Sequence, residues 1–444
     1  MMRVLLVYTN RYRPMAPPPI GLAYLLEPLR RGGHEVEVLD LMFSPDPKAA
    51  LLHTIDDFKP RVAGFSIRNV DNQDMRHIEY FLGEAKELIA MARERGVVTV
   101  LGGTAFTTFP AEMMGYTGAD YGIAGQGEKS LPLLLRSLGT GAPDKEIPGL
   151  AWREGGSVKL NPPDFGGYCG SRARWEALRL DGYKKSFFAG AVLTKSGCPH
   201  RCAYCNAAAA FGGSFRQRTP EDVVGEIKSL KARGINVITL TDACFNVPLG
   251  YAKEVLKAIV KANVKVYLNT TIVPVRGHFD DELLELYKKA GGIILSLGAE
   301  AFSEKMLESY RKPFTLDDVL ACAGLLNRRR MPFMVQALFG GPGEDASTVR
   351  ESMDTLRDVR YARFTYTMGI RLLPGTALYE TAKKEGLVKG PSELFTPKFY
   401  VSKDLDVRWA EGYIRKRLLR YSYRSLRMLP FYAMCALARR GVLY

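Results

Sequence analysis

The sequence lacks long apolar segments. No run of about 18 or more uninterrupted apolar residues occurs in its 444 residues, so we expect no membrane-spanning helix. It also lacks a cationic start followed by an apolar run and a small-residue cleavage site, so we expect no secretory signal. These absences predict a cytoplasmic protein and leave only a peripheral membrane association open.

Cysteine is scarce and unevenly distributed. The seven cysteines form no regularly spaced framework, and three of them fall within eight positions. In a long chain without a secretory signal, this pattern indicates metal binding rather than disulfides. Cys169, Cys322 and Cys435 are expected to be packing residues. Cys244 could contact a substrate, although a buried packing role is the favoured alternative.

Acidic residues are too few to balance the basic ones. The chain has 62 Lys and Arg against 47 Asp and Glu, which gives a net charge of +15 and a pI near 9.4. Such an imbalance suits nucleic acid, an anionic membrane surface or an anionic substrate. No nucleic-acid-binding module accompanies the charge, so no nucleic-acid partner is expected.

Much of this charge lies at the C-terminal end. Residues 401–444 carry ten Lys and Arg against three Asp and Glu, and residues 408–424 mix basic and aromatic side chains at helical intervals. Two hypotheses fit this pattern. The segment is a basic amphipathic helix that lies on an anionic membrane or contacts a lipid substrate, or it is a closing helix packed over the preceding domain.

The first 140 residues alternate between strand and helix patterns. Strands are expected at 3–8, 35–39, 62–67, 97–101 and 121–123, and helices at 20–31, 75–95 and 129–138. This alternation predicts an α/β domain with a parallel, doubly wound (flavodoxin- or Rossmann-like) sheet. Ligands of such sheets bind outside the carboxyl ends of the strands.

A second alternation follows an irregular segment. Residues 141–187 are expected to be a linker with a small hairpin near 150–160. Six further strands are expected at 188–194, 237–241, 265–269, 293–297, 333–338 and 364–367. Six βα units predict a partial (β/α)6 barrel over 188–380, and residues 381–444 are expected to form a basic, partly helical C-terminal segment.

The clustered cysteines follow the first strand of this barrel. Cys198, Cys202 and Cys205 have the spacing Cys-x3-Cys-x2-Cys. Thiolates are the ligands of iron–sulfur clusters, and a cubane held by three of them leaves its fourth iron open to a small molecule. A zinc site completed by His200 is the alternative, although structural zinc sites usually use two separated pairs.

With Tyr204 in its aromatic position, this motif resembles the Cys-x3-Cys-x-aromatic-Cys hallmark of the radical S-adenosylmethionine (SAM) superfamily. The resemblance implies a [4Fe–4S] cluster whose open iron binds SAM and whose reduction cleaves SAM to a 5′-deoxyadenosyl radical. It implies further SAM-binding residues at strand ends. These are Asp242 toward the methionyl part, Glu300 toward the ribose, and Gly340 and Gly341 near the adenine.

The first 140 residues resemble the cobalamin-binding domain that precedes the radical SAM domain in one subclass. The resemblance implies cobalamin contacts from residues at the first helix and at the ends of later strands: Pro19, Gly21, Gly102, Gly103, Thr104, Gly125, Gly127 and Glu128. Small residues allow close approach of a corrin, and amide groups at loop–helix junctions suit its phosphate.

One departure from other B12 proteins concerns the cobalt ligand. The Asp-x-His-x-x-Gly motif that supplies a histidine is absent, as it is from many members of this subclass. We expect the loop after the third strand, with Ser66, Arg68 and Asn69, to lie at the lower face of the corrin. The alternatives are an ordinary ion pair between Arg68 and Asp71, and a domain that kept its fold but lost cobalamin.

Together the resemblances imply a cobalamin-dependent radical SAM methyltransferase that acts on an unactivated carbon of its substrate. The substrate would be a small molecule or a lipid, and the electron donor a protein such as flavodoxin or ferredoxin. Two alternatives stay open. One is a cyclase or ring-rearranging enzyme with the same cofactors and no net methyl transfer. The other is a radical SAM enzyme for a hydrophobic substrate whose N-terminal domain binds no cobalamin.

Overall fold

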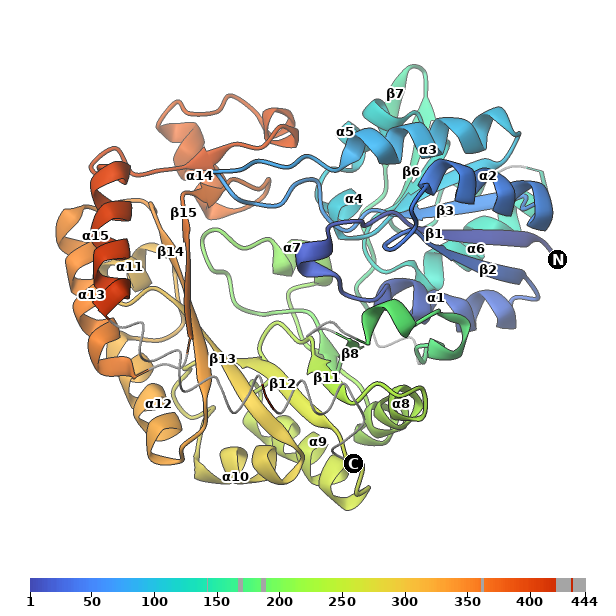
Figure 1. Cartoon of the computed structure of the whole chain (residues 1–444). Coiled ribbons are helices and arrows are strands. Elements are labelled where there is room, and N and C mark those ends of the chain that lie inside the picture. Colours follow the sequence, from blue (N-terminus) through green and yellow to red (C-terminus); the bar gives the residue numbers. More distant parts are fainter. Residues whose placement is uncertain (142, 167–170, 185–188, 361–362, 421–432, 434–444) are drawn as a thin grey trace. The chain divides into compact units, whose positions relative to one another are not determined.

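The computed structural model describes residues 1–141, 143–166, 171–184, 189–360, 363–420 and 433 (Figure 1). Contacts within the chain divide these residues into two compact units. The first comprises the described residues of Met1–Asn72, Glu79–Ser186 and Ala209–Gly212. The second comprises those of Gln73–Ile78, Phe187–Ala208 and Gly213–Tyr444.

The first unit is built on a seven-stranded sheet of order β2-β1-β3-β4-β5-β6-β7. Its strands are β1 (Arg3–Tyr8), β2 (Glu35–Asp40), β3 (Val62–Ser66), β4 (Val98–Gly102), β5 (Tyr121–Ile123), β6 (Leu150–Glu154) and β7 (Ser157–Leu160). The first five strands are parallel, which confirms the doubly wound fold. The hairpin β6–β7, predicted inside the linker, adds to the β5 edge and so belongs to this unit.

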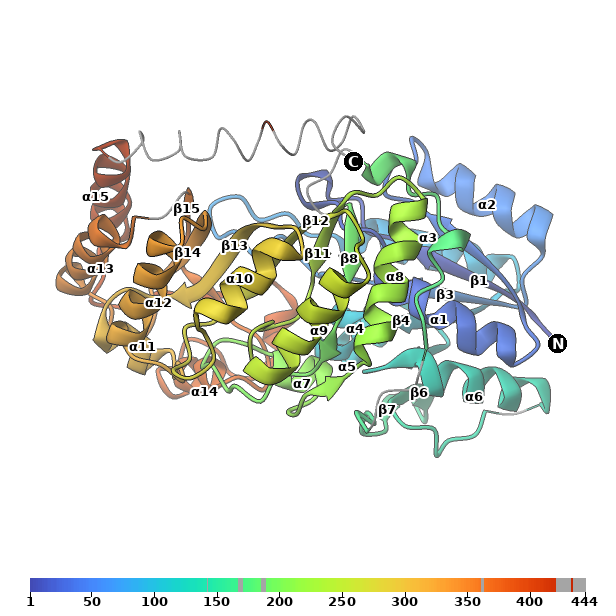
Figure 2. The ribbon, with the colours of Figure 1, turned by 90° about the horizontal axis from the view of Figure 1, so that it is seen from below.

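Helices cover both faces of this sheet. On one face α1 (Ile20–Arg31) packs against α6 (Gly127–Gly139). On the other α3 (Leu82–Glu94) packs against α2 (Pro47–Phe58) and α5 (Pro110–Thr117), as Figure 2 shows. Because both faces are covered, the central strands are apolar runs, and all but the first residue of β1 are buried.

One helix was predicted to begin several residues before its actual first residue. The periodicity predicted a helix from Met75, but α3 starts at Leu82. Residues 73–78 instead form a loop that packs in the second unit. There the Met75 sulfur lies close to Gly369, and the Arg76 guanidinium lies 5.5 Å from the centre of the Tyr366 ring.

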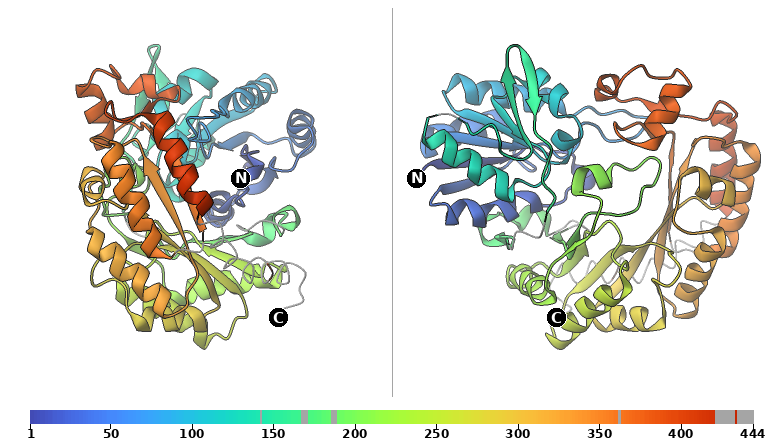
Figure 3. Two further views of the ribbon diagram at one scale, coloured as in Figure 1. Left: turned by 60° about the vertical axis from the view of Figure 1, so that its left-hand side comes forward. Right: turned by 180° about the vertical axis from the view of Figure 1, so that it is seen from behind.

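The second unit contains a six-stranded parallel sheet of order β15-β14-β13-β12-β11-β8. Its strands are β8 (Gly190–Val192), β11 (Val237–Leu240), β12 (Tyr267–Ile272), β13 (Gly292–Glu300), β14 (Phe333–Phe339) and β15 (Arg363–Met368). The sheet has two edges and does not close, so it is the predicted partial barrel (Figure 3).

Helices line the outside of this sheet (Figure 1): α8 (Pro220–Ala232), α9 (Leu249–Lys261), α10 (Asp281–Lys289), α12 (Leu316–Arg328) and α13 (Ala346–Val359). Their starts follow from capping side chains that accept backbone N–H groups of the first turn. Thr219 caps α8 and Asp280 caps α10, while α12 and α13 begin with capping boxes at Thr315 and Asp345.

The basic C-terminal segment begins with α15 (Val407–Arg420), which packs on α13. Ala410 and Ile414 are fully buried. Arg417 pairs with Asp354 of α13 at 3.4 Å, whereas Arg415 and Lys416 are exposed. This arrangement agrees with a closing helix whose other cations are solvated. The apolar part at 426–437, Ala433 apart, lies outside the described residues, so membrane contact stays a prediction. Among the described residues, no helix is both long and apolar enough to cross a bilayer.

Candidate functional site

The three clustered cysteines lie in one loop, residues 197–206, between β9 (Lys195–Ser196) and α7 (Ala207–Phe211). Two backbone hydrogen bonds hold its centre. The Ala203 N–H donates to the Tyr310 carbonyl at 2.8 Å, and the Leu378 N–H donates to the Ala203 carbonyl at 2.7 Å. The loop therefore rests on the residue after α11 (Glu304–Ser309) and on the start of α14 (Ala377–Lys384).

The thiols of this cysteine loop are free, and their environments differ. Cys198 is buried, Cys202 is half-buried and Cys205 is exposed. No three His, Cys, Asp or Glu side chains of the described residues converge to hold a single metal ion. A cubane takes one thiolate per iron, and the three free thiols of this loop are ligands of the kind that a [4Fe–4S] cluster uses.

Cys244, in the loop after β11, lies against Cys198. Both side chains belong to a small buried cluster with Val247. The Cys244 thiol donates a hydrogen bond to the Cys198 sulfur, and this bond lowers the pKa of Cys198 to about 6. Cys244 is therefore buried, as the favoured alternative expected, and it supports one of the candidate ligands.

A buried lysine that the sequence analysis missed lies beside Tyr204 of the cysteine loop. The Lys312 ammonium donates to the Tyr204 hydroxyl at 2.8 Å and contacts the Glu300 carboxylate. The Tyr204 hydroxyl in turn donates to Glu300 at 3.1 Å. The Lys312 side chain is only 4% exposed and that of Glu300 is 25% exposed. Two of the predicted SAM-contacting residues, Tyr204 and Glu300, are thus brought together by this cation.

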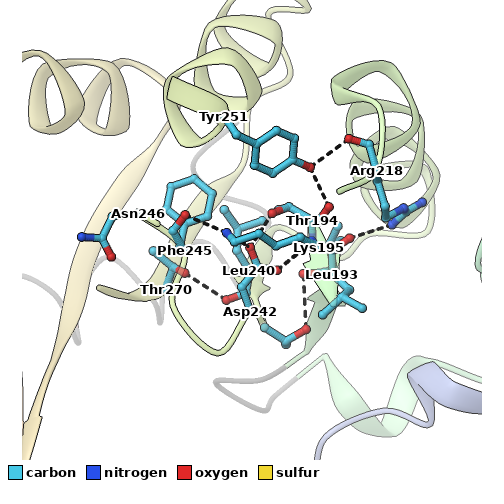
Figure 4. A network of polar contacts seen from close by, with 12 residues as sticks. Leu193, Thr194, Lys195, Arg218, Leu240, Asp242, Phe245, Asn246, Tyr251 and Thr270 are labelled. Atoms are coloured by element: carbon cyan, nitrogen blue, oxygen red, sulfur yellow. Dashed lines mark hydrogen bonds and ion pairs between the residues drawn. The ribbon is translucent and has the colours of Figure 1, made fainter. Parts of the chain in front are cut away.

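Asp242 occupies the centre of a buried polar network at the end of β11 (Figure 4). Its carboxylate accepts hydrogen bonds from the Thr194 N–H at 2.8 Å, from the Thr194 hydroxyl, and from the Lys195 ammonium at 3.1 Å. The Asp242 and Lys195 side chains are at most 1% exposed. The network ties the residues just before the cysteine loop to the next strand end. The predicted contact of Asp242 with SAM stays a prediction, because this carboxylate is already well occupied by the protein.

The two arginines near the start of α8 are also buried. Arg218 bonds to the Leu193 carbonyl at 2.8 Å and pairs with Glu226, and Arg216 is 8% exposed. Neither arginine is therefore solvated. The Arg218–Glu226 pair anchors the strand that leads to the cysteine loop.

The predicted adenine-side segment forms a tight turn after β14. A side chain on Gly341 would place its Cβ 2.1 Å from the Tyr310 ring, and Gly340 has a φ of +100°. The Glu344 carboxylate accepts the N–H groups of both glycines. Burial raises the pKa of Glu344 to about 7, although these two hydrogen bonds oppose the shift. The glycines are thus required by local packing, and their proposed contact with SAM remains a prediction.

In the first unit, the strand register brings the predicted cobalamin-binding residues to the edge of the sheet that is formed by the carboxyl ends of its parallel strands. Tyr8 pairs with Ser66, and Ser66 pairs with Gly102, so β1, β3 and β4 end level. The other predicted residues lie in the loops and helix starts beyond these ends: Pro19, Gly21, Arg68, Asn69, Gly103, Thr104, Gly125, Gly127 and Glu128. This is the edge at which ligands of doubly wound sheets bind.

The glycines at this edge fall into two kinds. A Cβ on Gly103 (φ +94°) would lie 2.4 Å from the Ile67 carbonyl oxygen, and one on Gly125 (φ +81°) would lie 2.8 Å from Pro163. The chain's own packing requires glycine at these two positions. Gly21 and Gly102, in contrast, would direct a Cβ into open space. Only these two leave room that a ligand could use, which fits a corrin at this edge.

Family models match both units. The B12 binding domain matches residues 11–135, and the Radical SAM superfamily matches residues 192–356. The chain joins a B12-binding domain to a radical SAM domain. The predicted family, fold class and cofactors are thereby confirmed.

Known proteins are similar to most of this chain. Tryptophan 2-C-methyltransferase of Streptomyces laurentii is 27% identical over 86% of this chain and 74% of the relative. The radical SAM methyltransferase TsrM of Kitasatospora setae, solved with cobalamin and a [4Fe–4S] cluster bound, superposes with a TM-score of 0.78. TsrM is 28% identical over 86% of this chain and 75% of its own. Anaerobic magnesium-protoporphyrin IX monomethyl ester cyclase of Synechocystis sp. is 26% identical over 66% of this chain and 59% of the cyclase. The chain is thus homologous to cobalamin-dependent radical SAM methyltransferases and to a cyclase.

Sequence reasoning missed the two buried lysines of the radical SAM domain. Lys195 adjoins the cysteine motif, and that proximity was the one available signal. Lys312 lies in the connection from α11 to α12, more than one hundred residues beyond the cysteines. Only the path of the folded chain brings its ammonium to Tyr204, so no spacing could have indicated it.

Proposed function

We propose that this protein is a cobalamin-dependent radical SAM methyltransferase that alkylates an unactivated carbon of a small-molecule substrate. The observation that carries the proposal is the pairing of a three-cysteine loop at the strand ends of a partial barrel with a B12-binding domain in one chain. The homologous methyltransferases support it.

The cysteine loop would hold the cluster through the Sγ atoms of Cys198, Cys202 and Cys205. When bound, the cluster with SAM supplies a 5′-deoxyadenosyl radical, and cobalamin supplies the methyl group. Tyr204, Asp242, Glu300, Gly340 and Gly341 are the proposed SAM-side residues. Of these, Glu300 offers a partly exposed carboxylate, whereas Asp242 is fully enclosed. We therefore assign Glu300 the direct contact and Asp242 the support of the cysteine loop.

The first unit would hold cobalamin at the aligned strand ends. Gly21 and Gly102 leave room for the corrin, and the N-terminus of the 13-residue helix α6, at Gly127 and Glu128, offers N–H groups to its phosphate. The loop with Ser66, Arg68 and Asn69 would lie at the lower face of the corrin. A low-potential protein such as flavodoxin or ferredoxin is the proposed electron donor.

Alanine variants of the cysteines test the proposal. The protein is purified without oxygen, supplied with iron, sulfide and cobalamin, and incubated with SAM and a reductant. We expect 5′-deoxyadenosine from the wild-type protein and none from Cys198→Ala, Cys202→Ala or Cys205→Ala, because each removes a ligand of the cluster. The control is Cys322→Ala, which changes a buried cysteine of α12 that is not a proposed ligand. This variant should retain the cleavage of SAM. Persistent cleavage in any ligand variant would contradict the assignment.

A second candidate keeps the cofactors but omits methyl transfer, and the cyclase relative favours it. The two outcomes differ in the mass of the product. A methyltransferase gives a product heavier by one CH2, and the added carbon carries the label of methyl-labelled SAM. A cyclase gives a product lighter by hydrogen and free of label.

A further inference from the structure

Lys312 has no assigned role, although its side chain is only 4% exposed and lies beside the cysteine loop. Its ammonium donates to Tyr204, which lies between Cys202 and Cys205 in the sequence. It also lies over the rings of Tyr204 and Phe314, at 5.3 and 5.7 Å from their centres. Enclosure by two rings and a carboxylate holds this charge in one place, where little water screens it.

Geometry places the Lys312 ammonium beside the loop of the candidate ligands. Its hydrogen-bond partner Tyr204 lies directly before Cys205 and two residues after Cys202. Burial alone would lower the pKa of Lys312, yet Glu300 holds that pKa above its ordinary value, so the ammonium stays charged. The Glu300 side chain is 25% exposed and that of Lys312 only 4%, so water screens the carboxylate more than the ammonium, and a net positive field is left at the loop.

We propose that Lys312 is a positioning residue that sets the reduction potential of the cluster by placing a fixed positive charge beside its thiolates. The inference rests on the proposed function, because it assumes the cluster. Three thiolates make the cluster anionic, and one electron from a low-potential donor adds a further negative charge. A nearby cation stabilises the reduced state more than the oxidised state, and net charge is one of the determinants of cluster potentials. Glu300 opposes the effect of Lys312 on the reduction potential, because its negative carboxylate offsets part of the positive field.

The test is a redox titration of the cluster, followed by electron paramagnetic resonance without SAM or substrate. In Lys312→Met we expect the ratio of reduced to oxidised cluster at a fixed potential to fall roughly tenfold, the size of one charge interaction in a partly shielded site. That change corresponds to about 59 mV for a one-electron couple. Lys312→Arg, which keeps the charge, should restore the wild-type value.

Two further variants separate a charge effect from a structural one. Glu300→Gln should shift the potential in the positive direction, opposite to Lys312→Met, whereas general damage to the site would not reverse sign. Lys305→Met, which removes an exposed lysine paired with Asp345, should leave the potential unchanged.

An unchanged potential in Lys312→Met with an intact cluster would overturn this inference and leave the proposed function standing. If Lys312→Met takes up no cluster, the inference is tested by Glu300→Gln alone. A reduction potential in Glu300→Gln that is unchanged or shifted in the negative direction overturns the inference. A wild-type protein that holds no cluster would overturn both proposals.

Discussion

At the scale of single residues, the cysteine loop depends on buried charges, each of which would be costly to leave without its partner. Removing Asp242 would leave the Lys195 ammonium without its carboxylate in a site from which water is excluded. Breaking a buried pair in this way costs about 3–5 kcal/mol. We therefore expect Asp242→Ala to lower the free energy of unfolding of the apo-protein by that amount, measured by denaturant unfolding.

The matched control for Asp242 is an exposed pair in the same unit. Glu285 and Lys289 pair at 2.7 Å on α10, with both side chains more than half exposed. Glu285→Ala should leave stability nearly unchanged, because an exposed pair contributes little. Equal losses in the two variants would contradict a supporting role for Asp242.

Glu344 predicts a pH dependence of stability. Its pKa is raised from an ordinary 4.5 to about 7, chiefly by burial, so the folded protein binds this proton more tightly than the unfolded chain. The resulting stability is fully present below pH 4.5 and is lost as the pH rises to about 7. The loss is about 3 kcal/mol.

Glu344→Gln removes this titrating group, so the stability of the variant should depend less on pH. The melting temperatures of the two proteins, each measured at pH 5 and at pH 8, would show this difference. The glutamine side chain can still accept the N–H groups of Gly340 and Gly341. A wild-type protein whose melting temperature changes with pH in parallel with that of the variant would contradict the assignment.

At the scale of elements, the end of β4 has one glycine that packing requires, Gly103, and one that packing does not require, Gly102. Gly103→Ala places a methyl group against the Ile67 carbonyl at a positive φ, which should cost about 1–3 kcal/mol in stability. Gly102→Ala meets no protein atom within 4 Å and should leave stability unchanged. If the corrin approaches this edge, Gly102→Ala should still reduce cobalamin uptake, measured by corrin absorbance after gel filtration. Uptake equal to the wild type would contradict the proposed position of the corrin.

The sequence predicted most elements but not all of their ends. Central strands such as β1 were predicted because their residues are buried on both faces and form apolar runs. The start of α3 was missed, since Met75 and its neighbours are apolar or charged at helical intervals but pack in the other unit. Met75 is only half-buried there, and the spacing of apolar residues does not report the unit that they contact.

The same limit applies to the candidate site. The Cys-x3-Cys-x2-Cys spacing and Tyr204 were sufficient to predict the cluster, because all four residues lie in one short loop. The partners of Glu300 and Asp242 were not predictable, because they depend on which strand ends become neighbours in the sheet. Whether those carboxylates face a ligand or a lysine is decided by the fold.

At the scale of the whole molecule, the two units explain why one chain can use two cofactors. Each unit contains a run of parallel strands with loops at their carboxyl ends, and each matches the family model of one cofactor. Part of the net charge of +15 lies on α15, where Arg417 pairs with α13 and Arg415 and Lys416 are exposed.

The central claim is that three thiolates of the cysteine loop hold a cubane with one iron open to SAM. Electron paramagnetic resonance of the anaerobically reconstituted, reduced protein, recorded with and without SAM, tests it most directly. The account predicts a [4Fe–4S] signal in the wild type whose shape changes when SAM is added. The absence of such a signal, or a signal that SAM leaves unchanged, would contradict it.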